Sequence, residues 1–115
     1  EDICDYYESQ NFKYCLFNRG FHGDDKGYGN NIIKVKNSAG IVTQAIVTLD
    51  SHSYIDGDIL GLAWKYDNLH DSQVNWYKTE IQKLVSANMA IDPTATELNN
   101  LAFLHIPTME YRDER

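Results

Sequence analysis

The sequence is poor in the residues that mark several specialised classes of protein. Among its 115 residues are 2 cysteines and 2 prolines, and 10 Lys and Arg stand against 17 Asp and Glu. Two cysteines are too few for the dense disulfide framework of a small secreted scaffold. No apolar run approaches the roughly 18 residues that a membrane-spanning helix requires. The composition therefore predicts a soluble domain with no membrane partner.

The shortage of basic residues also restricts the binding partners that we expect. The formal net charge is −7, and Lys34 and Lys36 form only a thin basic stripe. Affinity for nucleic acids depends on clustered Lys and Arg, so the sequence predicts no nucleic-acid binding through a basic patch. If the chain meets a phosphate group, a metal ion must help it to do so.

The start of the chain lacks an initiator Met and a secretory signal stretch. We therefore expect Glu1 to be a processing point or a cut within a longer chain, which leaves the compartment open. Cys4 and Cys15 could form a disulfide, but the default expectation for two cysteines is buried thiols.

What is present is a succession of helix and strand signals. Glu1–Ser9 is typical of the end of a helix, because its apolar residues are spaced to share a face. Asn31–Lys36 and Ile41–Leu49 are rich in β-branched residues and flank the turn residues Asn37–Gly40, which predicts a β-hairpin. Both faces of the second strand carry apolar residues, so we expect that strand to be buried on both sides.

The second half of the chain predicts a long helix and a further strand. The helix has Asp71 or Ser72 as its N-cap and ends at about Ser86, because apolar residues recur there at helical spacing: Val74, Tyr77, Ile81, Leu84 and Val85. The apolar run Leu101–Leu104 predicts a buried strand. Residues 50–69 are too many for a simple connection, and we expect them to cover another part of the protein. The resulting fold class is α/β.

His105 is the first candidate for chemistry, because it follows the predicted strand Leu101–Leu104 directly. Open α/β sheets place functional side chains at the carboxyl ends of their strands. An imidazole there can bind a divalent metal ion through one nitrogen while the other nitrogen donates a hydrogen bond. Periodicity alone favours the alternative, a half-buried histidine hydrogen-bonded to the backbone.

The other histidines are weaker candidates. His52 follows a strand end and could reach a substrate from the wall of a pocket, whereas Asp50 and Ser51 are expected to fix the loop by hydrogen bonds. His22 and His70 are predicted to be loop residues, and the sequence indicates no partner for either of them.

Four short strings then occur in a suggestive order along nearly the whole chain. They lie within Gly27–Asn30, Leu49–Tyr54, His70–Tyr77 and Leu101–Pro107. Read together, they resemble the calcineurin-like metallophosphoesterases, in the branch near the purple acid phosphatases. Members of that branch often read Gly-Tyr-Gly-Asn, Leu-Asp-Ser, Gln-x-x-Trp-Tyr and Phe-His-Ile-Pro in this order. Each string alone is weak, but the four in order are fairly specific.

The resemblance implies a fold and a site. The fold is a four-layer α/β/β/α sandwich, with helices outside two central sheets. The site holds two divalent metal ions, of which Fe, Mn or Zn are expected, and it hydrolyses phosphoesters. The family's His-Ile-Pro histidine is a metal ligand, and this role carries over to His105. Thr108 and Met109 stand where the family usually has Leu-Pro.

The resemblance also implies that most of the active site lies elsewhere. The family's other metal-ligand motifs should precede Glu1 or follow Arg115, so residues 1–115 are expected to be a single incomplete domain from the second half of the enzyme. We expect this piece to be inactive alone and to self-associate through exposed sheet edges. The alternative is a noncatalytic α/β interaction module that descends from such an enzyme and has lost its metals.

Overall fold

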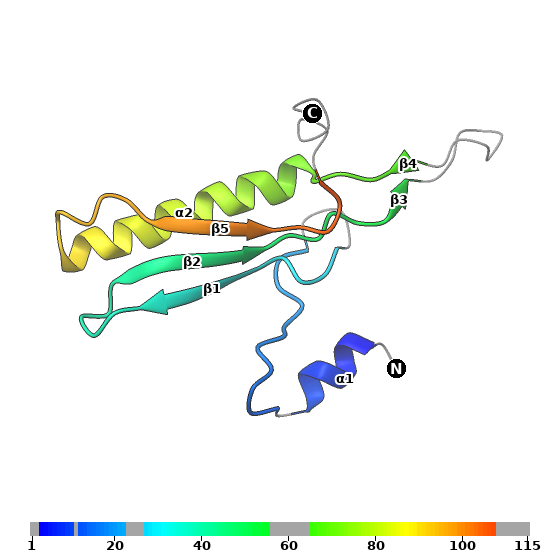
Figure 1. The fold of residues 1–115 in the computed structure, drawn as a ribbon, viewed down its shortest axis with the longest axis horizontal. Coiled ribbons are helices and arrows are strands. Elements are labelled where there is room, and N and C mark those ends of the chain that lie inside the picture. Colours follow the sequence, from blue (N-terminus) through cyan, green and yellow to red (C-terminus); the bar gives the residue numbers. More distant parts are fainter. Residues whose placement is uncertain (1–2, 11, 23–26, 56–64, 108–115) are drawn as a thin grey trace.

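The computed structural model describes residues 3–10, 12–22, 27–55 and 65–107. Within them the chain forms a mixed α/β fold with two helices, a three-stranded sheet and a pair of two-residue strands (Figure 1). The elements in chain order are α1 (Ile3–Ser9), β1 (Asn31–Lys36), β2 (Val42–Thr48), β3 (Tyr54–Ile55), β4 (Lys65–Tyr66), α2 (Asp71–Ile91) and β5 (Asn99–Phe103).

The main sheet has the order β1-β2-β5. Strands β1 and β2 pair antiparallel, which confirms the predicted hairpin. Its turn forms because the Asn37 side-chain oxygen accepts hydrogen bonds from the N–H groups of Ala39 and Ile41, and because Gly40 adopts a φ of 85°. Strand β5 pairs with β2 in parallel after the chain has crossed over through α2.

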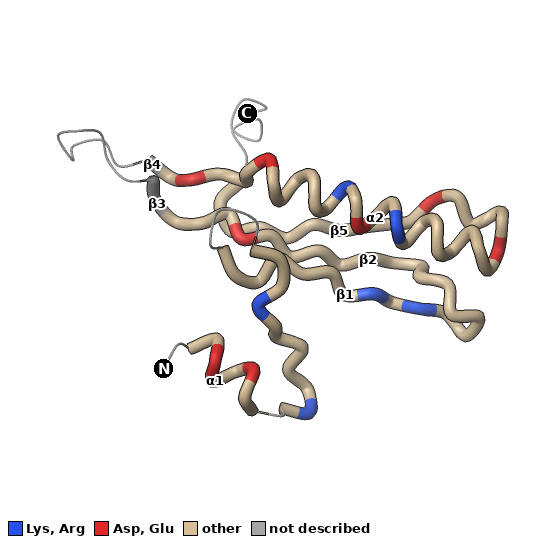
Figure 2. Tube along the Cα trace, turned by 180° about the vertical axis from the view of Figure 1, so that it is seen from behind, with Lys and Arg blue, Asp and Glu red and all other residues tan. Residues whose placement is uncertain are grey.

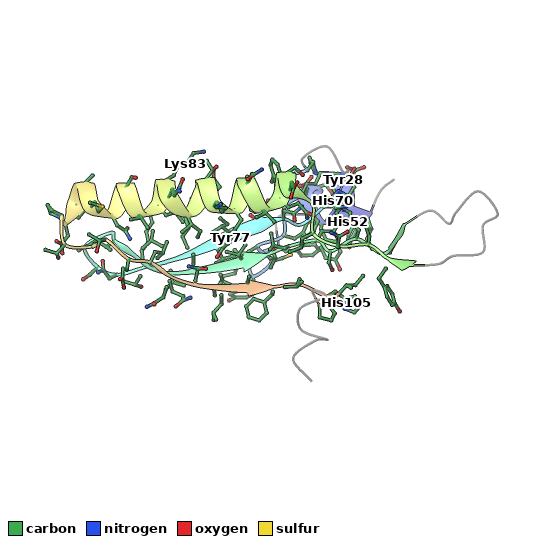
Figure 3. All side chains as sticks on the ribbon, turned by 90° about the horizontal axis from the view of Figure 1, so that it is seen from above. Tyr28, His52, His70, Tyr77, Lys83 and His105 are labelled. Carbon is green, nitrogen blue, oxygen red and sulfur yellow. The ribbon has the colours of Figure 1, made fainter. Side chains whose placement is uncertain are left out.

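Helix α2 lies along one face of the sheet, as Figures 1 and 3 show. The core between them is small, because only Val42, Ala45 and Leu84 form its fully buried cluster. Three half-buried side chains pack around this cluster: Ile32, Ile81 and Leu98. Apolar burial here therefore joins the helix to β2 and to the start of β5.

Helix α2 is longer than the sequence predicts. It continues to Ile91 rather than ending near Ser86. Asn88 explains the extra length, because its side chain accepts a hydrogen bond from Val42 N at 2.8 Å and donates one to Val42 O at 2.8 Å. The helix ends before Asp92, which precedes a proline as predicted. Its N-cap is His70, not Asp71 or Ser72.

The face of the sheet opposite α2 carries exposed apolar side chains beside a few polar ones. Residues paired across strands share a face, and the pairs Ile33–Ile46, Ile46–Leu101 and Thr48–Phe103 place apolar side chains on this side. Four of them are 36% to 56% exposed: Ile33, Val35, Leu101 and Phe103. We call these four residues and Ile46 the open face.

Two burial predictions are corrected by this arrangement. The segment Leu101–Leu104 does contribute a strand, but all five residues of β5 are exposed rather than buried. Strand β2 is buried on the α2 side and only partly covered on the other. The reason in both cases is that no described element packs on the open face, and that β5 is an edge strand of the described sheet.

The segment from residue 50 to residue 69 contains structure of its own. Strands β3 and β4 pair antiparallel, Tyr54 with Tyr66 and Ile55 with Lys65. Residues 56–64 lie outside the described part of the chain. The segment therefore folds back on itself between the end of β2 and the start of α2 (Figure 1).

Residues 3–22 form an N-terminal arm that carries α1. None of the residues of α1 is buried, and the arm is held by contacts between Tyr6, Tyr7, Phe12 and Phe17. Arg19 forms ion pairs with two acidic residues of α1, Asp5 and Glu8. At the end of the arm, Phe21 stacks on Trp76 of α2 with ring centroids 5.2 Å apart.

The two cysteines lie in this arm. No disulfide joins Cys4 and Cys15. Cys4 is half-buried and Cys15 is exposed, so the prediction of buried thiols is wrong. The reason is that α1 contributes no buried residue to any core.

The charged residues are distributed over several elements in the part of the chain that the structure describes. Lys34 and Lys36 lie on β1, and other basic residues lie on α2 and on the N-terminal arm (Figure 2). Acidic residues lie on α1 and α2, so α2 carries both signs of charge. Among the described helices, none is both long enough and apolar enough to cross a membrane.

Candidate functional site

The four sequence strings meet at one end of the main sheet, where β2 and β5 end and α2 begins (Figure 1). Five residues from these strings make the contacts that join them. We call this group the junction: Asn30, Asp50, Ser51, Gln73 and Ile106. Three of its side chains are polar and at most 2% exposed: Asn30, Ser51 and Gln73. Buried polar groups require hydrogen bonds, and each of these three has them.

Asn30 is the centre of the junction. Its side-chain oxygen accepts hydrogen bonds from Asp50 N at 2.9 Å and from Gln73 Nε2 at 2.8 Å. Its side-chain nitrogen donates to the carbonyl of Phe21 at 2.8 Å. One fully buried amide therefore ties together the start of β1, the end of β2, the start of α2 and the N-terminal arm.

Gln73 positions the first turn of α2. Its Nε2 donates to the Asp50 carbonyl at 2.6 Å as well as to Asn30, and its Oε1 accepts from His70 N at 2.9 Å. The hydrogen bond from His70 N to Gln73 Oε1 satisfies a backbone donor at the helix N-terminus. The start of α2 is therefore fixed against the carboxyl end of β2.

Asp50 and Ser51 fix the loop that follows β2, as predicted. The Asp50 carboxylate accepts from Tyr28 N at 3.0 Å and from His52 N at 2.8 Å. The Ser51 hydroxyl oxygen accepts from Ile106 N at 2.9 Å. Ser51 thereby attaches the His-Ile-Pro string to the end of β2.

His105 is exposed, two residues beyond the end of β5. Figure 3 shows it beyond β5 and apart from His52 and His70. Its ring makes no hydrogen bond to any described residue, and it belongs to no described group of three ligating side chains. It is not packed against α2, so the alternative of a half-buried histidine does not hold.

His52, Asp67 and His70 come together in a cluster that the sequence did not predict. One imidazole nitrogen from each histidine and one carboxylate oxygen of Asp67 lie within 4.8 Å of one another. His70 Nε2 is 3.1 Å from Asp67 Oδ1, and His52 Nδ1 is 3.8 Å from Asp67 Oδ2. The two imidazole rings are 4.7 Å apart between centroids. His70 therefore has a partner, contrary to the sequence prediction.

A signal for part of this cluster was present in the sequence. Asp67 and His70 are three residues apart, directly before the helix. A carboxylate at that spacing from the N-cap histidine can reach its ring. The contribution of His52 could not be inferred in this way, because it depends on how the segment from β3 to β4 folds back.

Asp67 is held in its ionised form. Partial burial opposes ionisation of this carboxyl and is the largest single influence on it. The Asn68 N–H, the hydrogen bond from His70 and the charges of His70 and His52 together outweigh burial, so the pKa of Asp67 lies below its ordinary value. A carboxylate results that can accept hydrogen bonds or bind a cation at neutral pH.

His52 has an unusual conformation. Its φ is 59°, and it is the only non-glycine residue with positive φ in the described part of the chain. Its Nε2 is buried and has no hydrogen-bond partner. A Cβ atom on Gly27 would stand 3.0 Å from this nitrogen, so the first glycine of the Gly-Tyr-Gly-Asn string makes room for the ring.

Comparison of the chain with known protein families, with curated proteins and with solved structures gives no match. The junction, the exposed His105 and the cluster of His52, Asp67 and His70 are therefore the features from which a function can be argued. All of them lie at or beside the end of the sheet where β2 and β5 finish.

Proposed function

We propose that this chain supplies one side of the active site of a metal-dependent phosphoester hydrolase of the calcineurin-like type. The convergence of the four sequence strings at the junction is the observation that carries this proposal. Strings scattered from residue 27 to residue 107 are joined there through Asn30, Gln73 and Ser51. Open α/β sheets bind their ligands at the carboxyl ends of strands, which is where the junction lies.

His105 is the metal ligand in this proposal. Its imidazole is exposed, and no described residue forms a hydrogen bond with the ring. Its position is held from the backbone, because the Ser51 hydroxyl accepts the N–H of the next residue, Ile106, at 2.9 Å. A metal ligand needs a neutral imidazole nitrogen and a fixed position, and the second requirement is supplied by Ser51.

One ligand does not hold two ions, so the fit is partial. Among the described residues, the only group of three ligating side chains does not include His105. When bound, two divalent ions would stabilise the phosphoryl oxygens and lower the pKa of a bound water. The remaining ligands must come from residues beyond those described, and this chain positions His105 beside them.

The open face supports the four-layer sandwich as part of the proposal. Exposed apolar patches mark surfaces where another element packs, and here they cover the side of the sheet opposite α2. We propose that the second sheet of the sandwich covers this face. In its absence we propose that two chains associate through the open face or through the edge of β5, which has no outer neighbour among the strands that the structure describes.

The proposal is tested with the protein encoded by the complete gene. Hydrolysis of an aryl phosphate that is lost on chelation and restored by Fe, Mn or Zn is the expected result. His105→Ala should lower metal content or turnover roughly 10–100-fold or more. His22→Ala is the control, because His22 donates to the Gly27 carbonyl at 3.0 Å and has no assigned role at the metal.

Two outcomes would overturn the proposal. A folded complete protein without metal and without activity would favour the noncatalytic interaction module instead. A His105→Ala protein with normal metal content and turnover would remove the site assignment. The 115-residue chain alone should not turn over the aryl phosphate, and steady, chelator-sensitive hydrolysis by it would contradict the view that the site is completed elsewhere.

A further inference from the structure

We propose that His52, Asp67 and His70 form a second metal site, which binds a single divalent transition-metal ion and is built wholly within this chain. It shares no ligand with the centre proposed for His105 and does not depend on that proposal. Zinc is the ion that fits best, because two imidazole nitrogens and one carboxylate oxygen are donors that zinc prefers.

The distances within the cluster are close to those around a shared ion, and the contact between His70 and Asp67 is a hydrogen bond in the absence of one. Two donors on one tetrahedral zinc ion stand roughly 3.3 Å apart, given metal–ligand distances of about 2.0–2.1 Å. His70 Nε2 and Asp67 Oδ1 are 3.1 Å apart. His52 Nδ1 is 3.8 Å from the other carboxylate oxygen, Asp67 Oδ2, which is too long for a hydrogen bond. The three ligand atoms, one from each residue, lie within 4.8 Å of one another, so they must move closer together to share an ion.

Each ligand residue is also held at its backbone. The N–H of His52 donates to Asp50 Oδ1 at 2.8 Å, and the N–H of Asp67 donates to the Ser53 carbonyl at 3.2 Å. The N–H of His70 donates to Gln73 Oε1 at 2.9 Å. The three ligands therefore come from three separate anchor points, and binding an ion does not require the chain to be ordered first.

The conformation of His52 indicates that its position serves a purpose other than packing. A non-glycine residue at positive φ costs of the order of 1–3 kcal/mol and persists where the surroundings impose it. In return the ring obtains one long contact, from Nδ1 to the Asn68 carbonyl at 3.4 Å, while Nε2 has no partner. A metal ion bound to Nδ1 would replace this long contact with a stronger one, whereas Nε2, which faces Gly27, would gain no partner from it.

Asp67 adds the charge that a cation needs. Its Oδ1 accepts a hydrogen bond from the N–H of Asn68 at 2.8 Å, which fixes the carboxylate between the two rings. Three protein ligands leave a fourth position on a tetrahedral ion open to water or to an oxygen of a ligand. The site is thus of the open type rather than the closed four-ligand type of purely structural zinc.

The test is metal binding by the 115-residue chain, measured without any enzymatic assay. Zn²⁺ is titrated into metal-free protein by calorimetry, and Co²⁺ is titrated while its visible absorption is recorded, because tetrahedral cobalt absorbs far more strongly than hydrated cobalt. We expect one ion per chain and the visible spectrum of tetrahedral cobalt.

Variants identify the ligands. His70→Gln and Asp67→Asn should each weaken binding by roughly 10–100-fold or more, and Asp67→Asn keeps an oxygen that can accept from Asn68. His105→Ala is the matched control and should bind as the unaltered chain does. Circular dichroism should show that α2 is intact in all three variants, so that loss of binding is not loss of folding.

Three results would overturn the proposal. The first is the absence of saturable Zn²⁺ or Co²⁺ binding by the folded chain. The second is equal binding by the unaltered, His70→Gln and Asp67→Asn chains. The third is loss of binding in His105→Ala, which would place the ion at the other histidine. Failure here leaves the phosphoesterase proposal standing, because that proposal is tested through His105 in the complete protein.

Discussion

The junction and the N-terminal arm place polar and apolar side chains in opposite ways. In the junction the polar side chains of Asn30, Ser51 and Gln73 are almost completely buried. In the arm, four aromatic residues contact one another while remaining 38% to 49% exposed: Tyr6, Tyr7, Phe12 and Phe17. The most deeply buried large side chains of the described chain are thus mostly polar, and many of its aromatic side chains are not buried.

The junction is held by directional hydrogen bonds, whereas the arm is held mainly by apolar contacts, which do not define one geometry. Burying an amide is unfavourable unless its hydrogen bonds are made, so the contacts of the junction permit essentially one arrangement. Apolar contacts are not directional, and those in the arm leave surface that another element could cover. The junction therefore has the fixed geometry that a functional site requires. The arm is expected to unfold before the rest of the described chain.

Replacing Asn30 should give the largest effect and is the strongest test of the comparison. Asn30→Ala removes three hydrogen bonds, which leaves Asp50 N and the Phe21 carbonyl unpaired and leaves Gln73 Nε2 with only the Asp50 carbonyl as acceptor. We expect the free energy of unfolding to fall by about 3–5 kcal/mol in urea denaturation. Ile3→Ala, in the exposed arm, should change it by no more than about 0.5 kcal/mol. Equal effects would abolish the distinction between the two regions.

The second test concerns the buried amide of Asn88, at the far end of the sheet. Asn88→Ala removes both hydrogen bonds to Val42 and should lower the free energy of unfolding by about 2–3 kcal/mol. It should also shorten α2, which amide hydrogen exchange after residue 86 would detect. Ser86→Ala is the control, since Ser86 is exposed and bonds only to Gln82 within the helix. An unchanged helix end in Asn88→Ala would refute our explanation of its length.

The open face provides a third test, through association rather than unfolding. Phe103→Ser replaces an apolar side chain that is 56% exposed, so it should weaken self-association of the 115-residue chain by about tenfold, equivalent to about 1.4 kcal/mol. Sedimentation equilibrium measures the change. Tyr14→Ser, in the arm, should leave association unaltered. A chain that remains monomeric at high concentration would show that the open face does not act as an interface between copies.

A fourth, smaller effect concerns the stacking of Phe21 on Trp76, which connects the arm to α2. Phe21→Ala should lower stability by about 1–2 kcal/mol, from lost stacking and lost burial. A double-mutant cycle with Trp76→Ala should give a coupling of about 0.5–1.5 kcal/mol. Zero coupling would mean that the stacking of these two rings does not help to attach the arm.

The smallest effect involves Asp92, which follows α2. Hydrogen bonds from the side chain and the N–H of Thr94 hold the pKa of Asp92 below its ordinary value. The folded state then binds fewer protons than the unfolded state near pH 4, so this contribution to stability is present at neutral pH and is lost as the pH falls through the folded pKa. Thr94→Val should raise the Asp92 pKa in an NMR titration, and Thr79→Val should not.

The sequence predicted the elements well where local pattern decides them. The hairpin residues alternate as strands do, and the turn Asn37–Gly40 has the residues that its conformation requires. The end of α2 was placed too early because Asn88 is a weak helix former, and its stabilising partner is on a strand far away in the sequence. Local propensity contains no information about that partner.

The site was predicted less completely, for the same physical reason. Asp50 and Ser51 were correctly expected to fix the loop, because residues of these types form short-range hydrogen bonds. The cluster of His52, Asp67 and His70 depends on β3 pairing with β4, a tertiary event. The exposure of β5 was missed because burial depends on what lies across the open face, which an apolar run cannot reveal.

The parallel pairing of β2 with β5 has a consequence for the order of folding. The hairpin of β1 and β2 and the helix α2 join neighbouring residues and can form within microseconds. Strand β5 is expected to pair later, because β3, β4 and α2 all lie between it and its partner β2 in the sequence. Closing so long a loop costs conformational entropy before any contact between the two strands is gained. A change at Ala102 should then accelerate unfolding and hardly slow folding. Among the strands of the main sheet, β5, which leads to His105, would therefore be the last to pair and the first to separate.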